Sequence, residues 1–492
     1  MAIRAKLSAP RDEQQSWRWH EAKWTSISAS ILKRGDRRLE GDNYLLGGYG
    51  VRLAFESQHI PLPTLSRLAT VWQPSRLKGI QLTKEHGTPF LAATQVYDLR
   101  PSPRKFLSLD RTAGSSERFI DNGTIVVTCS GNVGRVTLIY NAHTGVLISH
   151  DLLRITPKDN AAWGWLYAYL RSSQGAAMMT SAQYGHMIKH LEPSHLHALP
   201  IPVPRDDVLS EFHAQVSEIL RARNKAWDLQ VQAESIFSTA VDQQAISSEK
   251  ASVGFSVRTT ELFGKRRRFE ASYHSPVATE ILRQFERVGL NTEPLRSVTE
   301  KVWWMTRFKR VFGEAGVRYM SADNLFSINP SNIKKVMIEQ AENPDSYRVK
   351  SGWIVMACSG QTYGLNGSVA LMTEPHEDAF FSHDLVRIIA DKSKIRAGYL
   401  FTVLGHPQLG RPLVIRNAYG TSIPHLDPED VAAIPVVRLS ESVENEIADL
   451  MELAVGLRAS ADVLENHVTK RASELNDKFL AGDTVDFNIA FE

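Results

Sequence analysis

Two segments of the chain carry apolar residues at alternating steps of four and three, the spacing of a helix that buries one stripe. In the second segment these positions are Val443, Ile447, Leu450, Ala454, Leu457, Ala461, Leu464 and Val468. Subtracting 235 gives Val208, Phe212, Gln215, Ile219, Ala222, Ala226, Leu229 and Ala233, of which only Gln215 is polar. Sustained heptads favour helix pairing, so we predict two long helices that pack on each other. The alternative is two amphipathic helices that each lie on their own domain.

Shorter apolar runs predict buried strands at matching places in the two halves. The runs GTIVVTCS and GWIVMACS, which end at Ser130 and Ser359, are rich in apolar and β-branched residues and begin at glycine. We expect each to be followed by a Gly-rich loop, a strand that holds Ser-His-Asp, and a helix of small and aromatic residues (161–174 and 396–404). Exits punctuated by proline then lead into the two long helices.

Six blocks of sequence recur in the same order in the two halves. RRLE matches RRFE at an offset of 230, LATVW matches VTEKVW at 231, and NGTIVVTCSG matches SGWIVMACSG at 229. LISHDLLRI matches FFSHDLVRI at 233, and both YGHMIKHL with YGTSIPHL and ALPIP with AIPVV match at 235. This series predicts a tandem duplication. We expect an α+β fold in which two mixed α/β domains, 1–204 with an N-terminal extension and 251–440, are joined by long helices in 205–250 and 441–492, the latter with a C-terminal tail.

Composition and charge narrow the class of protein. The chain is 43% hydrophobic and 23% charged with two cysteines, which fits a globular protein without a disulfide framework. No apolar run approaches the ~20 residues of a membrane span, and the N-terminus lacks a signal-peptide core, so we expect a cytoplasmic protein. Residues 258–310 hold 12 Lys and Arg against 6 Asp and Glu, whereas 441–492 hold 4 against 12. This asymmetry predicts one surface made for a polyanion and another that stays off it.

The repeated Ser-His-Asp block is not expected to be catalytic. Adjacent side chains of a strand point to opposite faces, so Ser149, His150 and Asp151 would not converge as a triad, whose members meet in space. A strand whose His or Asp anchors a neighbouring loop is the favoured interpretation. Nucleotide-binding, HExxH and paired CxxC motifs are absent, as is the Asp/Asn-Pro-Pro-aromatic motif of amino-methyltransferases. We therefore expect no catalytic residue, metal ion or cofactor in this chain, and Cys129 and Cys358 as core residues.

Cations interleaved with aromatic residues are the remaining chemical signal, and they are typical of nucleic-acid binding. They occur in RPSPRKFLSLDR in the first copy, in GKRRRFE and KVWWMTRFKR in the second, and beside the polar loops CSGNVGR and CSGQTYGLNG. Each feature alone also fits a solvated face or a tight turn, but the matched occurrence in two copies favours function. The predicted DNA-binding residues are Arg104, Lys105, Arg111, Ser130, Asn132, Arg135, Tyr184, Lys189, Arg267, Lys301, Trp303, Arg307, Lys309, Arg310, Ser359, Gln361, Tyr363, Asn366 and Tyr419.

Taken together, the two units resemble the DNA-specificity (S) subunits of type I restriction–modification systems. The features that carry the resemblance are a CSGxxG loop, an SHDLxRI segment, a Tyr-Gly…His-Leu block, a proline-rich exit and a terminal long helix, and they span nearly the whole chain. The resemblance implies a non-catalytic subunit with pseudo-twofold symmetry. Its two target-recognition domains would each read half of a bipartite site in double-stranded DNA, and an antiparallel coiled-coil spacer would join them.

The resemblance also implies partners. Methyltransferase (M) subunits would carry S-adenosylmethionine and modify adenine, and a restriction and translocase (R) subunit would join them. The long N-terminal stretch, with RRLEGDNYL and its echo RRFEASYHS, also resembles S-like chains of related phage-defence systems.

The length of the second apolar seam agrees with a spacer between half-sites. From Val443 to Val468 it spans 26 residues, which is about 39 Å of helix or about 11 base pairs of B-DNA. Two alternatives remain open. A diverged nuclease or methyltransferase would show metal-dependent or S-adenosylmethionine-dependent activity as an isolated chain, and a protein-binding scaffold would lack the steep salt dependence of phosphate contacts.

Overall fold

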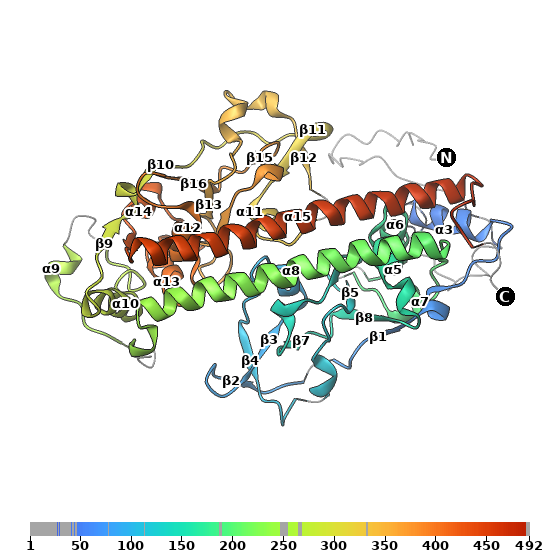
Figure 1. The fold of residues 1–492 in the computed structure, drawn as a ribbon, viewed down its shortest axis with the longest axis horizontal. Helices are drawn as coiled ribbons and strands as arrows, with labels where there is room; N and C mark the ends of the chain where they lie inside the picture. Colours follow the sequence, from blue (N-terminus) through green and yellow to red (C-terminus); the bar gives the residue numbers. More distant parts are fainter. Residues whose placement is uncertain are drawn as a thin grey trace, which may run out of the picture. The chain divides into compact units, whose positions relative to one another are not determined.

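The computed structural model describes residues 27, 29, 41, 44, 47–76, 78–112, 114–185, 189–246, 254–263, 268–330 and 333–488. The chain divides into two compact units whose elements are labelled in Figure 1. Unit 1 contains residues 1–97, 101–220 and 464–492, and unit 2 contains residues 98–100 and 221–463. Two long helices, α8 (Asp206–Ala240) and α15 (Glu441–Leu480), contribute to both units. Among the described residues, no helix is long and apolar enough to span a lipid bilayer.

Unit 1 is built on an antiparallel sheet in the order β1-β8-β5-β6 and a smaller sheet in the order β2-β4-β3-β7. Every residue of β5 is buried, because Val126 packs against Leu91 and Ile148 of the smaller sheet while α5 contacts the neighbouring strands β6 and β8. The elements are α3 (Gly48–Glu56), α4 (Leu65–Leu68), β1 (Ala69–Trp72), β2 (Gln81–Leu82), β3 (Thr88–Leu91), β4 (Lys105–Leu107), β5 (Ile125–Thr128), β6 (Val136–Leu138), β7 (Leu147–Ile148), β8 (Leu152–Pro157), α5 (Trp163–Arg171), α6 (Ser173–Ala182) and α7 (Pro193–His197).

Unit 2 repeats this plan with sheets in the orders β10-β16-β13-β14 and β12-β11-β15, and with a two-stranded sheet of β17 and β9. Its central strand β13 is also buried at every position. The elements are α9 (Thr259–Leu262), α10 (Pro276–Arg287), β9 (Thr292–Pro294), β10 (Thr299–Trp303), β11 (Phe312–Met320), α11 (Ala322–Leu325), β12 (Lys335–Val336), β13 (Ile354–Ala357), β14 (Val369–Leu371), β15 (Phe380–Phe381), β16 (Leu385–Ala390), α12 (Ala397–Gly405), α13 (Gly410–Ile415), α14 (Pro428–Ala432) and β17 (Pro435–Val437).

The strand registers confirm the duplication residue by residue. In unit 1 Trp72 of β1 pairs with Arg154 of β8, and in unit 2 Trp303 of β10 pairs with Arg387 of β16. The parallel pairs agree as well, with β3 beside β7 and β11 beside β15. The α+β fold with two mixed α/β units is therefore as predicted, and the compact units place the first part of α8 in unit 1 and its remainder in unit 2.

A glycine at the same place in each copy lets a helix of the domain lie close to a long helix. In unit 1 a Cβ atom on Gly164 of α5 would come within 2.5 Å of the backbone of Phe212 in α8. In unit 2 a Cβ atom on Gly398 of α12 would lie 2.7 Å from the carbonyl oxygen of Ala448 in α15. Both distances are below normal carbon contacts, so the two close approaches require glycine.

The two long helices pack on each other within each unit, as their heptads predict. In unit 2, Ala226 and Leu229 of α8 form a buried cluster with Ala454 of α15, flanked by Leu450 and Leu457. Polar contacts then show how the two helices run relative to each other. Arg223 pairs with Asp462 (3.1 Å), and Arg458 donates to Gln230 (2.7 Å), so positions that ascend on α8 descend on α15. The helices are antiparallel there, and in unit 1 Arg471 of α15 pairs with Glu211 of α8.

Two details of the secondary structure differ from the expectation. The helix expected over 161–174 ends at Arg171, because Ser172 leaves the helical conformation and its hydroxyl accepts the Gly175 N–H as the N-cap of α6. The Ser-His-Asp triplets lie outside strands, in the turns between β7 and β8 and between β15 and β16. The long helices extend over 35 and 40 residues, further than the 26-residue apolar seam.

Candidate nucleic-acid interface

In unit 1 the polar loop after β5 is joined to the Tyr-Gly segment through the backbone. Ser130 and Tyr184 both form isolated bridges with His190. The Gly131 N–H donates to the Lys189 carbonyl at 3.2 Å, and its φ of 72° lies in the left-handed region that favours glycine. The predicted residues Ser130, Tyr184 and Lys189 are therefore neighbours.

Unit 2 repeats this framework with other side chains. Ser359 and Tyr419 both bridge His425, the Gly360 N–H donates to the Pro424 carbonyl at 3.1 Å, and the φ of Gly360 is 120°. The predicted residues Ser359 and Tyr419 are therefore also brought together. A common backbone frame presents the loop of each unit, so the side chains can differ without changing the frame.

The Ser-His-Asp turn of each unit is hydrogen-bonded to the cysteine at which the polar loop begins. In unit 1 the Ser149 hydroxyl donates to an Asp151 carboxylate oxygen (3.0 Å) and accepts the Asp151 N–H (3.1 Å). His150 lies 3.5 Å from the other carboxylate oxygen, and the Cys129 N–H donates to the Asp151 carbonyl (3.1 Å). The same contacts recur in unit 2 between Ser382, His383, Asp384 and Cys358.

This geometry corrects the expectation that the three side chains point to opposite faces of a strand. A serine hydroxyl that bonds the backbone two residues on forms a turn in place of the extended ladder, so Ser149 and Asp151 do meet. The carboxylate lies between the hydroxyl and the imidazole, so the histidine is not in position to take a proton from the serine as a triad base does. The turn anchors the loop, as the interpretation of the sequence had it.

Two side chains of the loop of unit 2 hold it by hydrogen bonds, and Tyr363 makes no such contact in the described part of the chain. Asn366 is buried, and its amide donates to the carbonyls of Gly360 and Pro424 (both 2.9 Å). The Gln361 amide donates to the Ser422 carbonyl at 2.9 Å. Tyr363 is 71% exposed and forms no hydrogen bond or ring contact with the described residues. Of the residues predicted in this loop, Tyr363 is the most available to a ligand.

The loop of unit 1 is shorter and carries different chemistry. Asn132 is exposed, and its carbonyl accepts the Thr128 hydroxyl. The Arg135 guanidinium lies over the Tyr97 ring at 4.1 Å, and the Tyr97 hydroxyl donates to the Arg135 carbonyl at 2.6 Å. The loop therefore offers an amide and a stacked cation where unit 2 offers an aromatic ring.

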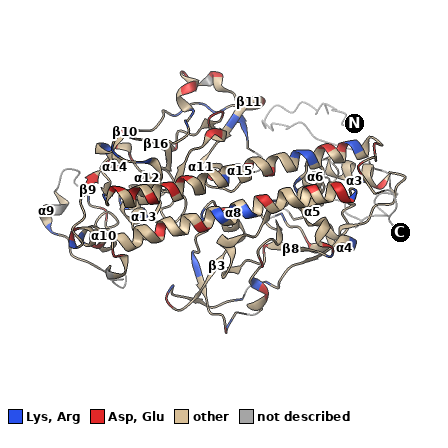
Figure 2. Ribbon diagram, viewed as in Figure 1, with Lys and Arg blue, Asp and Glu red and all other residues tan. Residues whose placement is uncertain are grey.

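A basic groove of about 790 Å³ opens in unit 2. It is formed by the connection from β10 to β11, by β11, by α11 and by the residue before β12; its lining residues are Arg307, Phe308, Lys309, Arg310, Phe312, Tyr319, Ser321, Asp323, Asn324 and Lys334. Figure 2 colours the Lys and Arg positions of the ribbon blue and the Asp and Glu positions red, and the first turn of α15 carries acidic residues. The three predicted cations Arg307, Lys309 and Arg310 therefore lie in one groove.

The cations of this groove are not neutralised by ion pairs. None of Arg307, Lys309, Arg310 and Lys334 forms an ion pair with a carboxylate of the described residues, and Asp323 is the only acidic residue that lines the groove. Arg310 donates to the Tyr319 hydroxyl (3.3 Å), and the Lys334 ammonium lies 5.2 Å from the Phe312 ring centroid. Such a surface suits a polyanion.

His383 links the groove to the loop framework. Burial lowers the pKa of His383, and the nearby Arg310 and Arg307 lower it further, against the opposing effect of Asp384. The histidine is therefore within the field of the groove cations while its neighbour Asp384 holds the loop. Lys334 is a groove residue that sequence reasoning missed, because it lies outside the run of cations and aromatic residues from Lys301 to Arg310.

The other predicted residues lie elsewhere. Arg104, Lys105 and Arg111 of unit 1 are exposed and form no ion pair with the described residues. The Lys301 ammonium lies over the Trp303 ring at 4.7 Å. Arg267 is outside the described residues. Whether any of these side chains contacts DNA stays a prediction.

The arginine of each SHDLxRI segment is buried rather than offered to a ligand. Arg387 donates to the carbonyls of Ser382 (3.3 Å), Leu385 (2.8 Å) and Tyr347 (3.3 Å). Its counterpart Arg154 lies over the Trp72 ring at 4.9 Å. Burial lowers the pKa of each guanidinium to about 10. Both are buried and stay cationic at neutral pH.

Nucleophilic and metal chemistry find little support in the described residues. Cys129 and Cys358 are buried and free, and burial raises the pKa of each thiol to about 12, which keeps them as unreactive thiols. Across the described ranges, no cluster of His, Cys, Asp and Glu is arranged to hold a metal ion.

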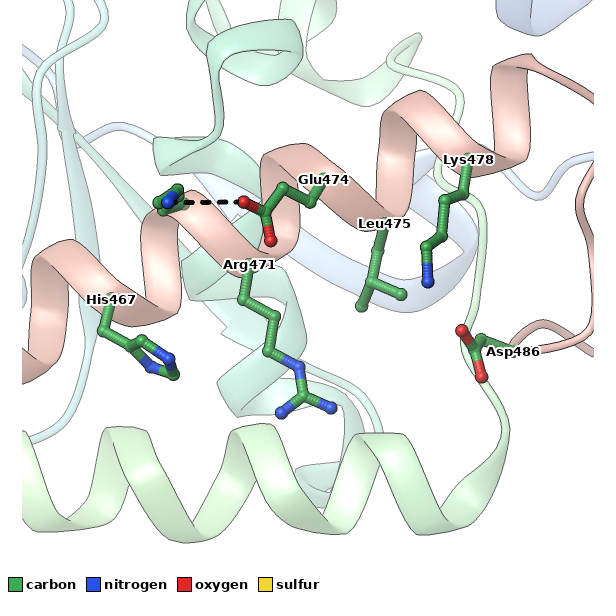
Figure 3. A pocket seen from close by; sticks show the side chains of 7 residues that line it. His467, Arg471, Glu474, Leu475, Lys478 and Asp486 are labelled. Carbon is green, nitrogen blue, oxygen red and sulfur yellow. Dashed lines mark ion pairs between the residues drawn. The ribbon is translucent and has the colours of Figure 1, made fainter.

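A second cavity, of about 330 Å³, lies along the C-terminal part of α15 in unit 1 (Figure 3). It is lined by His467, Lys470, Arg471, Glu474, Leu475, Lys478 and Asp486. Lys470 pairs with Glu474 at 3.6 Å, and Arg471 extends toward α8, where it pairs with Glu211. Two of its cations, Lys470 and Arg471, are therefore paired with carboxylates, unlike the cations of the groove in unit 2.

Neither a protein-family model nor a curated protein sequence matches the chain. Several solved structures are similar in fold over most of their length. The S subunit of a type I restriction-modification system from M. genitalium is 14% identical, with a TM-score of 0.29 and coverage of 86% of this chain and 96% of that one. The HsdS subunit from Thermoanaerobacter tengcongensis is 12% identical, with a TM-score of 0.26 and coverage of 87% and 98%.

A third similar chain comes from a structure that describes complex assembly and conformational transition of the type I R-M system. It is 12% identical, with a TM-score of 0.25 and coverage of 86% of this chain and 99% of that one. At TM-scores below 0.5 these likenesses assign no function to the chain.

Proposed function

We propose that this chain is a non-catalytic, sequence-specific DNA-binding subunit that reads a bipartite site in double-stranded DNA. Each unit would read one half-site. The chain would direct adenine methyltransferase subunits to the site, with S-adenosylmethionine bound by those partners, and a restriction and translocase subunit would join the complex. This is the function of the S subunits that the sequence resembles.

One observation carries the proposal: the same scaffold is built twice and presents unlike loops at the same place. The bridges from Ser130 to His190 and from Ser359 to His425 hold both loops in one frame. Within that frame unit 1 offers Asn132 and the stacked Arg135, whereas unit 2 offers the exposed Tyr363. Two units that share one architecture but present different loop side chains suit a DNA target with two different halves.

The electrostatics support a nucleic acid as the ligand. The groove of unit 2 gathers Arg307, Lys309, Arg310 and Lys334 around one carboxylate, and phosphate contacts of this kind supply most of the sequence-independent affinity for DNA. The buried thiols of Cys129 and Cys358 and the turn geometry of Ser149 offer no activated nucleophile. Both facts favour binding over catalysis in this chain.

The test is to co-express the chain with the methyltransferase subunits of its own genome and to map methylated adenines by sequencing. We expect a split motif with adenine modified in both halves, and its loss when the chain is omitted. Methylation that is the same with and without the chain would contradict the proposal. Methylation by the isolated chain would favour the enzyme alternative.

A further inference from the structure

The connection that leaves the first strand of the main sheet is alike in the two units. In unit 1 it comprises residues 73–80 between β1 and β2, of which all but residue 77 are described, and in unit 2 it comprises 304–311 between β10 and β11. An offset of 231 places Arg76 on Arg307 and Lys78 on Lys309. The spacing Arg-x-Lys is therefore repeated, although the flanking residues differ.

The same backbone position is tethered in both connections. In unit 1 the buried Arg118 donates a 2.8 Å hydrogen bond to the carbonyl of Ser75, the residue before Arg76. In unit 2 the buried Tyr347 donates a 2.8 Å hydrogen bond to the carbonyl of Thr306, the residue before Arg307. The two donors, Arg118 and Tyr347, occupy equivalent positions of the repeat at an offset of 229. The hydrogen bond that tethers the backbone is thus retained, although the donor is a different residue type in each unit.

The cations held by these tethers are exposed and uncompensated. Arg76, Lys78, Arg307 and Lys309 are exposed, and none of them pairs with a carboxylate of the described residues. An exposed apolar side chain follows each pair two residues later. It is Ile80 in unit 1 (47% exposed) and Val311 in unit 2 (40% exposed), which are again related by the offset of 231. Two cations on a tethered backbone, beside an apolar group, suit a phosphodiester with its sugar.

The likeness of the two connections decides which part of the DNA they fit. Side chains that read bases should differ between the units, as the loops after β5 and β13 do, because the two half-sites differ. Side chains that meet a part of the ligand common to both half-sites should be alike, and that part is the phosphate backbone. A surface that serves only solubility would not need a buried donor to fix its backbone.

We propose that Arg76 with Lys78, and Arg307 with Lys309, are matched contacts to the phosphodiester backbone of duplex DNA, one pair for each unit. They add affinity without sequence preference, while the loops around Asn132 and Tyr363 select bases. This inference rests on the proposed function and assigns affinity and base selection to two different sets of residues.

The experiment measures duplex binding by the full chain, in complex with its methyltransferase subunits, as a function of salt concentration. The variants are Arg76→Gln with Lys78→Gln, and Arg307→Gln with Lys309→Gln. Each lost phosphate contact reduces the slope of log K against log salt by ~0.9, so each double variant should reduce it by about 1.8 while the methylated motif is unchanged.

Matched controls remove two exposed cations at the opposite end of the same strands. They are Arg67→Gln with Lys158→Gln in unit 1, and Arg296→Gln with Lys392→Gln in unit 2. These should keep the slope of the unaltered complex. If the connection variants also keep that slope, or if they change the preferred bases, the inference is wrong. If the unaltered complex binds duplexes without salt dependence or motif, the proposed function itself fails.

Discussion

The hydroxyl of Tyr347 donates a 2.8 Å hydrogen bond to the carbonyl oxygen of Thr306, so a residue of the buried core fixes the backbone that carries Arg307. The ring of Tyr347 also stacks on Phe380 with centroids 4.7 Å apart. Core packing and the position of a groove cation are therefore coupled through one side chain. The coupling can be cut by removing a single oxygen atom.

Tyr347→Phe should weaken duplex binding by about fivefold, the equivalent of the ~1 kcal/mol that one hydrogen bond contributes. The slope of affinity against salt should not change, because every cation remains. Fluorescence anisotropy over a range of salt concentrations measures both quantities. Tyr399→Phe is the matched control, since it loses a buried 2.7 Å hydrogen bond to the Val437 carbonyl away from the groove. Equal losses of affinity in the two variants would refute a specific role for the tether.

Ser149→Ala and Ser382→Ala should each lower the free energy of unfolding by ~1 kcal/mol, because each removes a hydroxyl that ties its turn to Asp151 or Asp384. Thermal unfolding measures the change. The methylated motif obtained with either variant should match that of the unaltered chain. A variant that keeps full thermal stability yet abolishes methylation would instead indicate a chemical role for the serine.

The stability of unit 2 should fall as the pH drops from about 6.5 toward 4. Burial lowers the pKa of His406 from 6.5 to about 4, although Glu234 opposes this and Arg100 adds to it. The Gln408 and Leu409 N–H groups both donate to Nδ1 of His406, at 3.3 and 3.2 Å, which requires the neutral ring. In the unfolded chain His406 is protonated below about pH 6.5, whereas in the folded chain it stays neutral down to about pH 4. The stability present above pH 6.5 is therefore lost progressively between pH 6.5 and pH 4.

The size of this effect is about 3.5 kcal/mol at most, at ~1.4 kcal/mol for each pH unit between the two pKa values. Chemical unfolding of the chain and of a His406→Asn variant at pH 4.5 and pH 7 measures it. The variant should lose less stability between the two pH values, since its amide does not titrate. An identical loss in both proteins would assign the pH dependence to carboxylates instead.

Most of the fold was predictable because it depends on periodic patterns. The heptads placed Ala226 and Ala454 in the contact between α8 and α15, and the repeated blocks aligned Trp72 with Trp303 in one register. The Ser-His-Asp turn was mistaken for a strand, because the Ser149 hydroxyl replaces a ladder hydrogen bond. Local competition of this kind leaves no periodic trace.

The candidate site was only partly predictable. The clustered cations Arg307, Lys309 and Arg310 were visible as a run, but Lys334 reaches the same groove from a separate stretch of sequence. The tether was hidden because its donor is an arginine in one unit and a tyrosine in the other. Positions that are equivalent in space but differ in residue type cannot be matched by residue identity. Arg76 and Lys78, in contrast, could have been found from the offset of 231 alone.

The length of α8 and α15 should set the gap between the half-sites. Inserting one heptad into both helices at paired positions, such as after Leu229 and after Leu457, next to the paired Gln230 and Arg458, adds about 10 Å of helix, or about 3 base pairs of DNA. The methylated motif should then keep both halves and gain a longer gap. The same insertion into α15 alone should disrupt the complex, because it puts the two seams out of register. A gap that stays constant after matched insertion would rule out the spacer role.

The most direct test of the central claim is the motif read by a chain altered in one recognition loop only. Tyr363→Ala changes the loop of unit 2, where Tyr363 is exposed, and leaves Gln361 and the buried Asn366, which hold the loop. Methylated sites would be mapped by sequencing with the altered and the unaltered chain. The account predicts that one half of the split motif becomes degenerate while the other half and the gap persist. Degeneracy in both halves, or in neither, would contradict the claim that each unit reads its own half-site.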